Sequence, residues 1–161
     1  QRQMCIRDSG AILRQEDLLE ASIEMAAAAA ELFIGQGIRT SLETNGPDLL
    51  TKEAVCLKAS CGAGHLDSIF RGLARIDLEK PAPSFEPIRE RLEEMEDRES
   101  LCTIFFSADA RPEFQQLLEK FRKEKREFIW FCPVNRIIRP EINAGIRPYT
   151  CLIDVEEGGR L

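Results

Sequence analysis

The stretch LCTIFFS, residues 101–107, decides the fold class of this chain. It is a continuous apolar run, which is typical of a strand buried on both faces of a sheet. A second run of this kind, EFIWFC at 127–132, follows after a segment of helix length. Two buried strands separated by a helix predict a parallel pair, with helices packed on the faces of the sheet. The sequence therefore predicts an α/β fold of three layers around a mostly parallel sheet.

Apolar residues recur at helical spacing in the segments between the predicted strands. The clearest case is EDLLEASIEMAAAAAELFI at 16–34, whose alanine-rich face lets a helix lie close against a sheet. Three more helices are expected: within 60–76 after a glycine loop, at 85–97 behind a Ser84 cap, and at 112–126. These segments supply the helical layers of the predicted fold.

Three further strands are expected. IRTSLET at 38–44 alternates apolar and polar residues and runs into the turn signal Asn-Gly-Pro at 45–47. VCLKAS at 55–60 is the next strand, which we expect to be antiparallel to the first, and YTCLIDV at 149–155 is the last. The chain of 161 residues fits a single domain.

Composition excludes several classes of function. The net charge is −6 and no basic cluster is interleaved with aromatic residues, so we predict no nucleic-acid binding. No apolar run is long enough to cross a bilayer, which predicts no membrane contact from this chain. Cys56 and Cys61, five residues apart, match no zinc or redox spacing. We therefore expect reduced thiols and a cytoplasmic location.

The first nine residues differ in kind from the rest. The codons for MCIRDS, residues 4–9, can be written ATG TGT ATA AGA GAC AG, which matches the mosaic-end adapter of transposase-based library preparation. We interpret residues 1–9 as non-native, adapter-derived sequence, the alternative being a short natural loop. Native sequence would then begin near Gly10.

A glycine loop, Gly62-Ala-Gly64-His65, opens a predicted helix directly after a strand, where backbone N–H groups can hold an anion. It lacks the Gly-Lys-Ser/Thr of a phosphate-binding loop and the Gly-x-Gly-x-x-Gly fingerprint, so a tight turn is the simpler interpretation. His65 is the only histidine, and Cys61 lies four residues before it. A thiol–imidazole nucleophile pair is therefore an enzymatic alternative, although no orienting third residue supports it.

Asp109 lies just past the apolar run 101–107, at the edge where open α/β sheets bind ligands. The alternative, which ordinary capping preferences favour, is an acid that caps the helix predicted at 112–126. The acidic run within 90–99 is interpreted as a solvated helix face.

Three segments together resemble a known family: LLEASIEMAAAAAELFIGQGIRTSLETNG at 18–46, GAGHLDSIFRGLARI at 62–76, and LCTIFFSADARPEFQQLLEKF at 101–121. In order and spacing they resemble the domain-of-unknown-function-58 family, which is von Willebrand factor A-like. The resemblance covers 18–134, most of the chain. Its most specific parts are Asn45-Gly46 and the helix opening Gly64-His65-Leu66.

The resemblance implies strands in the order 3-2-1-4-5-6, with the first strand between 38–44 and 101–107. Nothing before residue 16 matches that strand, so we expect a sheet that lacks its first central strand. Residues 10–161 would then be a partial von Willebrand factor A-like domain with a C-terminal tail, cut from a longer protein. The family's upstream part often carries membrane-spanning helices, which would anchor the intact protein.

A von Willebrand factor A domain can hold magnesium through Asp-x-Ser-x-Ser after its first strand, a threonine in a second loop and an aspartate after its fourth strand. The first motif is missing here, His65 stands about where the threonine would be, and Asp109 only roughly matches the aspartate. A hard cation needs several oxygen ligands. We predict neither a metal site nor a cofactor.

The resemblance implies a non-enzymatic protein-interaction or scaffold module whose partner is a MoxR-type AAA+ ATPase or its client. The binding surface would be the loops at the carboxyl ends of the strands, and the candidate residues are Asn45, Gly64, His65, Ser107 and Asp109. The alternative is a small α/β hydrolase-like enzyme that uses Cys61 with His65, or Asp109 as an acid or nucleophile.

Overall fold

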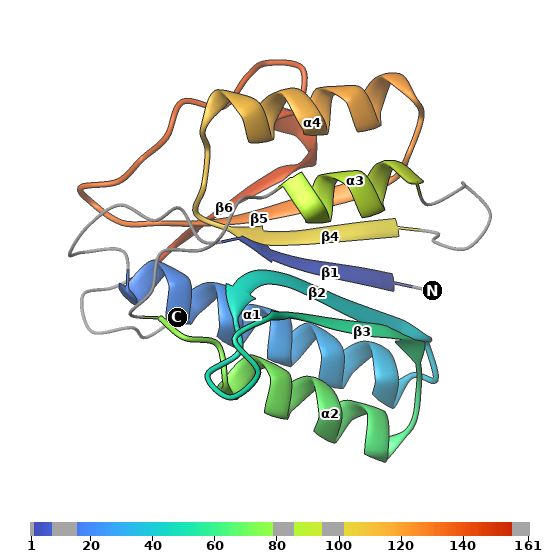
Figure 1. Cartoon of the computed structure of the whole chain (residues 1–161). Coiled ribbons are helices and arrows are strands. Elements are labelled where there is room, and N and C mark those ends of the chain that lie inside the picture. Colours follow the sequence, from blue (N-terminus) through green and yellow to red (C-terminus); the bar gives the residue numbers. More distant parts are fainter. Residues whose placement is uncertain (1, 8–15, 79–85, 95–101, 156–161) are drawn as a thin grey trace.

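A computed structural model describes residues 2–7, 16–78, 86–94 and 102–155 of the chain. These residues form an α/β fold with one six-stranded sheet in the order β3-β2-β1-β4-β5-β6 (Figure 1). The strands are β1 (Arg2–Arg7), β2 (Thr40–Pro47), β3 (Ala54–Ser60), β4 (Cys102–Ser107), β5 (Phe128–Val134) and β6 (Thr150–Asp154).

The sheet is mostly parallel. β1 pairs in parallel with β2 and with β4, and β5 pairs in parallel with β4 and with β6. Only β3 runs the other way, because it pairs antiparallel with β2 at one edge of the sheet. The expected strand order is therefore confirmed, and so is the expected antiparallel pairing of the strand at 55–60, which is β3, with the strand before it.

The expectation that the first central strand is missing is wrong, because Arg2–Arg7 fills the place between β2 and β4. In this register Met4 stands opposite Leu42 on one side and opposite Ile104 on the other. Two flanking strands each present a row of backbone N–H and C=O groups toward this gap, and leaving them unpaired inside a fold is costly. Any extended segment without proline can form these backbone bonds. Such a strand need not show the side-chain periodicity by which strands are predicted from sequence. The adapter interpretation concerns the origin of residues 1–9 and stays a prediction.

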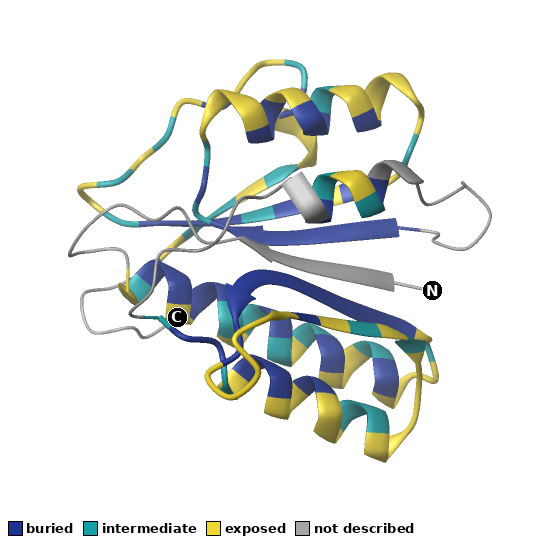
Figure 2. Ribbon diagram, in the orientation of Figure 1, coloured by how far each residue is buried: buried dark blue, intermediate teal, exposed yellow. Residues whose placement is uncertain are grey.

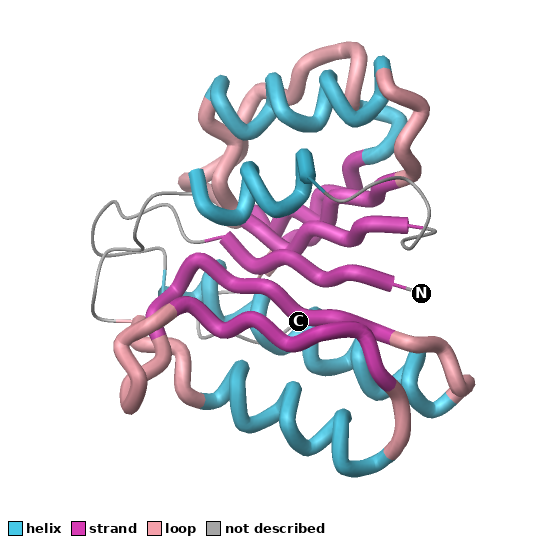
Figure 3. The backbone as a smooth tube through the Cα atoms, turned by 45° about the vertical axis from the view of Figure 1, so that its right-hand side comes forward, coloured by secondary structure: helices cyan, strands magenta, loops and turns pink. Residues whose placement is uncertain are grey.

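Helices form a layer on each side of the sheet (Figures 1 and 3). α1 (Glu16–Gly35) and α2 (Ala63–Ala74) lie on one face, and α3 (Glu86–Glu94) and α4 (Pro112–Lys123) lie on the other, while a short 3-10 helix, η1 (Arg147–Tyr149), precedes β6. α4 begins with proline at its first position and ends in basic residues, which suits the helix dipole. The predicted Ser84 cap lies outside the described residues.

The hydrophobic core is divided by the sheet into two parts. Ile104 and Phe106 of β4 join the cluster under α1 and α2, whereas Phe105 joins the cluster under α3 and α4. β4 is buried at all six positions, which confirms the prediction from its continuous apolar run. Figure 2 shows the same division, with buried residues on the sheet and on the inner sides of the helices.

Aromatic rings fill the core under α3 and α4. The ring of Phe114 meets that of Phe105 edge-on at 5.5 Å and that of Trp130 at 5.2 Å between centroids. Trp130 is completely buried, and its indole N–H donates to the carbonyl oxygen of Ser107 over 2.8 Å. This bond fixes the end of β4 relative to β5, at the edge of the sheet where the candidate residues were expected.

β5 continues through Pro133 to Val134, past the predicted end of the strand at residue 132. The pairing of β5 with β4 ends at Phe131, so Pro133 pairs with β6 alone. A proline is tolerated in a strand where the missing N–H has no ladder bond to make.

Candidate functional site

The parallel strands end together at one edge of the sheet, here called the carboxyl edge. Arg7 of β1 stands opposite Ser107, the last residue of β4, and the preceding residue of β1 stands opposite Thr44 of β2. Asn45 and Ser107 are therefore level with each other, one strand apart, and strand spacing separates their backbones by about 10 Å. Asp109 follows two residues after the end of β4. The structure thus brings three of the five predicted binding residues to the same edge.

Gly64 and His65 lie at the opposite, amino edge, which corrects the prediction that they belong to the same surface. β3 is antiparallel, so its last residue, Ser60, pairs with Thr40 at the start of β2. The imidazole Nε2 of His65 lies 2.7 Å from the carbonyl oxygen of Thr40. About 17 Å of strand separates this point from Asn45. A glycine loop reaches the carboxyl edge only after a parallel strand, so His65 does not stand where the family's threonine would be.

The proposed pair of Cys61 and His65 has no supporting geometry. A carbonyl oxygen only accepts, so Nε2 of His65 carries the proton that it donates to Thr40. Cys61 is exposed, and within the described part of the chain no hydrogen bond joins its thiol to the imidazole. The contact of His65 instead ties the start of α2 to the start of β2.

Asp109 is buried and is held by its neighbours. Its Oδ1 accepts from the backbone N–H of Arg111 at 2.9 Å, and both carboxylate oxygens accept from the Arg111 guanidinium at 2.8 to 3.1 Å. Its own N–H donates to the hydroxyl of Ser107 over 3.0 Å. These bonds shape the turn that leads from β4 into α4. The capping alternative is wrong in detail, because the N-cap residue of α4 is Arg111 and no side chain caps the helix. Burial raises the pKa of the Cys132 thiol to about 12, and the charge of Asp109 makes a smaller contribution in the same direction.

A divalent cation does not fit this arrangement. To bind Asp109, the ion would have to displace a guanidinium that already contacts both carboxylate oxygens. Among the residues that the structure describes, no group of three or more His, Cys, Asp or Glu side chains could hold a metal ion. The prediction that the chain has no metal site stays a prediction.

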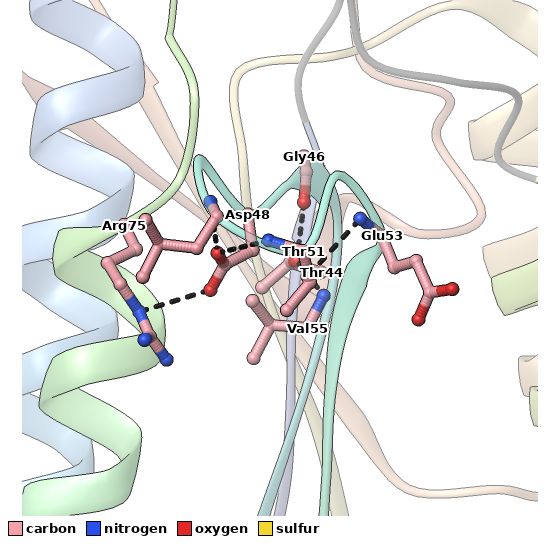
Figure 4. Close-up of polar contacts among 8 residues, drawn as sticks. Thr44, Gly46, Asp48, Thr51, Glu53, Val55 and Arg75 are labelled. Atoms are coloured by element: carbon pink, nitrogen blue, oxygen red, sulfur yellow. Dashed lines mark hydrogen bonds and ion pairs between the residues drawn. The ribbon is translucent and has the colours of Figure 1, made fainter.

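A polar network that sequence reasoning missed lies at the same edge, in the turn between β2 and β3 (Figure 4). Asp48 is 4% exposed, and its Oδ1 accepts from the N–H groups of Leu50 at 2.7 Å and Thr51 at 3.1 Å. Its Oδ2 lies 3.1 Å from Nε of Arg75, at the end of α2. The hydrogen bond from Leu50 is the main cause of a lowered pKa for Asp48, with Thr51 and Arg75 adding to it against the opposing effect of burial.

The strand that leads into this turn is fixed by side-chain bonds and by close packing. The Thr44 hydroxyl donates to the carbonyl oxygen of Gly46 at 3.0 Å and accepts from the N–H of Val55 at 3.1 Å. A Cβ at Gly46 would come within 2.6 Å of Cγ2 of Ile76, so only glycine fits there without a shift. The residue pattern Asp48-x-Leu50-Thr51 is a signal for an Asx-turn that could have been found in the sequence.

Backbone bonds also join this turn to the segment after α2. The N–H of Leu49 donates to the carbonyl oxygen of Arg75 at 2.7 Å, and the N–H of Asp77 donates to that of Pro47 at 2.8 Å. The turn is therefore held on both sides, while Leu49 is 46% exposed and Leu50 is 71% exposed. The carboxyl edge thus combines buried, bonded carboxylates with exposed leucines.

Comparison of the chain with known protein-family models and with functionally characterised proteins finds no match. Within the described residues, none of the helices has the length and apolar character needed to span a bilayer.

Proposed function

We propose that the protein is a non-enzymatic interaction or scaffold module of the von Willebrand factor A-like type, and that its partner is a MoxR-type AAA+ ATPase or a client of such an ATPase. The observation that supports this proposal best is the strand order β3-β2-β1-β4-β5-β6 with a single antiparallel edge strand. It is the order that the resemblance of residues 18–134 to the domain-of-unknown-function-58 family implies.

The chemistry of the carboxyl edge supports a binding role. Asp48 and Asp109 are both buried, and both use their oxygens to hold loop backbone and an arginine. A general acid or a nucleophile needs access to substrate, whereas a docking surface needs loops that keep one shape before the partner arrives. Carboxylates that organise loops in this way suit recognition of another protein.

Binding to a purified MoxR-type ATPase from the same genome tests the proposal. The intact protein is titrated against the ATPase without nucleotide, with ADP and with a non-hydrolysable ATP analogue, and the dissociation constant is measured calorimetrically. We expect binding in at least one nucleotide state, and H65Q at the amino edge is the control that should keep the wild-type affinity. Absence of binding in all three states would overturn the proposal.

A further inference from the structure

We infer that the outer part of the sheet beside α1, over β5 and β6, is a docking site for a basic amphipathic helix of a protein partner. This surface is called the β5–β6 face below. It consists of Ile129, Phe131, Cys151 and Ile153, with Leu32 of α1 at its border. The inference goes beyond the proposed function and does not depend on it, because it concerns another surface and another ligand.

Strand pairing places the four strand residues on one face of the sheet. Phe131 packs against the core cluster under α1 and α2, and side chains alternate along a strand, so Ile129 points to the same side. Cys151 pairs with Phe131, and paired residues share a face, so Cys151 and Ile153 point to that side as well. Leu152, which lies between them, packs against the core on the other side, as the alternation requires.

This face of β5 and β6 is left partly open. On this side of the sheet, α1 packs on β4 and β5 and α2 packs on β3 (Figure 1), and within the described residues no helix packs closely on β6. Ile129 is 37% exposed and Cys151 is exposed, while Phe131 and Ile153 are partly exposed. The opposite face is closed, since Trp130 is completely buried there. The outer strands are therefore covered well on one side only.

α1 adds an apolar border to the β5–β6 face. Ala21, Met25, Ala28 and Leu32 follow one another at helical spacing and lie along one side of α1. Ala21 is buried and packs with Val155, which directly follows β6, so this side of the helix is turned toward β6. Exposure rises along the row: Met25 is partly exposed, Ala28 is exposed and Leu32 is 56% exposed. The row and the strand residues thus form one apolar surface.

The dimensions of this surface suit one helix. Two neighbouring strands are together about 10 Å wide, which is close to the distance at which one helix packs beside another. The five residues of β6 extend over about 17 Å, a length that a helix of about 11 residues spans. An additional helix beside α1 would therefore cover β5 and β6 in the way that α1 covers β4.

The charges around the surface decide which helix it suits. Glu20, Glu24 and Glu31 are exposed on α1, which has no basic residue, and the exposed Glu127 directly precedes β5. A partner helix with lysine or arginine beside its apolar stripe would be complementary to these carboxylates. A second copy docked through the same face would bring like charges together, and an anionic lipid surface would also be repelled. The charges therefore favour a basic partner.

Protection of a cysteine from alkylation tests the assignment at the site itself. The probe is a synthetic peptide of about 14 residues, built of leucine and lysine at helical spacing, and its matched control has glutamate in place of lysine. Cys151 lies on the β5–β6 face, whereas Cys56 and Cys61 are exposed near the opposite end of the sheet. We expect the lysine peptide to slow alkylation of Cys151 by iodoacetamide at least fivefold and that of the other two less than twofold. The glutamate peptide should protect none of them.

Two variants separate the apolar part of the surface from its charges. L32Q/I129Q should abolish the protection of Cys151, whereas F70Q should keep it, because Phe70 is 38% exposed on α2. E24Q/E31Q changes only exposed carboxylates and should weaken the protection at least twofold. Equal urea midpoints for E24Q/E31Q and the wild type would show that the fold is unchanged in this variant.

Four results would overturn the inference. They are no protection by the lysine peptide, equal protection by the glutamate peptide, full protection in E24Q/E31Q, and protection of Cys151 that rises with protein concentration when no peptide is present. The last result would identify a second copy of this chain as the occupant. Binding of the ATPase is measured with another ligand, so the proposed function stands or falls separately.

Discussion

At the scale of single residues, Asp48 shows how one buried carboxylate organises a turn. Its Oδ1 accepts from the N–H groups of Leu50 and Thr51, and its Oδ2 forms an ion pair with Arg75. The hydrogen bond from Leu50 is the main reason for the lowered pKa of Asp48. Because the pKa of Asp48 is lower in the folded protein than its ordinary value of 3.8, the charged form favours folding. This contribution is complete above the ordinary value and is lost as the pH falls through the lower, folded value.

The variant D48N should therefore unfold at lower urea concentration than the wild type at pH 7, and the difference should shrink toward pH 3. The amide keeps the size of the side chain but loses the charge that Arg75 and the two N–H groups stabilise. D67N is the control, because Asp67 pairs with Arg71 on the exposed surface of α2. An equal loss of stability for D48N at both pH values would contradict the electrostatic explanation.

Position 46 also requires glycine, because the neighbouring side chain leaves no room for a Cβ atom. The variant G46A places a methyl group 2.6 Å from Cγ2 of Ile76, and overpacking of this kind costs about 1–3 kcal/mol of unfolding free energy. The matched variant G35A meets no atom within 4 Å and should be neutral or slightly stabilising, since alanine favours helix. Chemical denaturation measures both values. A G46A protein as stable as the wild type would show that the strand end can shift away from Ile76.

Thiol chemistry gives a further test at this scale. Cys56, Cys61 and Cys151 are exposed, whereas Cys102 and Cys132 are buried in the core. Burial also raises the pKa of Cys132 to about 12, so almost no thiolate forms there at pH 8. Iodoacetamide should label Cys56, Cys61 and Cys151 in the native protein, and Cys102 and Cys132 only in denaturant. Mass spectrometry of peptides reads the result, and rapid native labelling of Cys132 would contradict the core packing.

At the scale of elements, α4 depends on its aromatic contacts with the sheet. Phe114 is completely buried between Phe105 and Trp130, and truncation of a buried phenylalanine to alanine costs about 3–5 kcal/mol. The variant F114A should show this loss of unfolding free energy in urea titration. F70A is the control, because Phe70 on α2 is 38% exposed and should cost much less. Similar losses for the two variants would mean that α4 does not carry the core contact described here.

The elements also show which features of the fold were visible in the sequence. The continuous apolar run of β4 predicted a strand buried on both faces, and the alternation of strands and helices predicted the parallel sheet. These predictions depend on side-chain patterns, which the sequence displays directly. β1 was missed because residues 1–9 were interpreted as adapter-derived sequence, and its place in the sheet is seen only in its pairing with β2 and β4.

The candidate site was predicted less well than the fold. Asn45, Ser107 and Asp109 lie at the carboxyl edge, because Asn45 is near the end of β2, Ser107 ends β4 and Asp109 follows it. That they bind a partner stays a prediction. Gly64 and His65 were assigned to the wrong edge, although the predicted antiparallel direction of residues 55–60 already leads the chain to the amino edge. In the network around Asp48, the bonds from Leu50 and Thr51 are local and could have been predicted, whereas the ion pair with Arg75 joins a different element and could not.

At the scale of the whole molecule, β1 connects the two halves of the sheet. β2 and β3 lie on one side of it, and β4, β5 and β6 lie on the other. The carboxyl edge carries both the turn between β2 and β3 and the turn at Asp109 that follows β4, and β1 lies between the strands that lead into them. Loss of residues 1–9 would leave the facing edges of β2 and β4 without partners, so a variant without these residues should unfold at lower urea concentration.

Hydrogen exchange at β1, read residue by residue by NMR, is the most direct test of the complete sheet. Backbone amides within residues 3–6 should exchange as slowly as those within residues 103–106 of β4, because both segments take part in the same parallel ladder. Amides of residues 3–6 that exchange at the rates of an unfolded chain, while those of β4 stay protected, would contradict a sheet with Arg2–Arg7 at its centre.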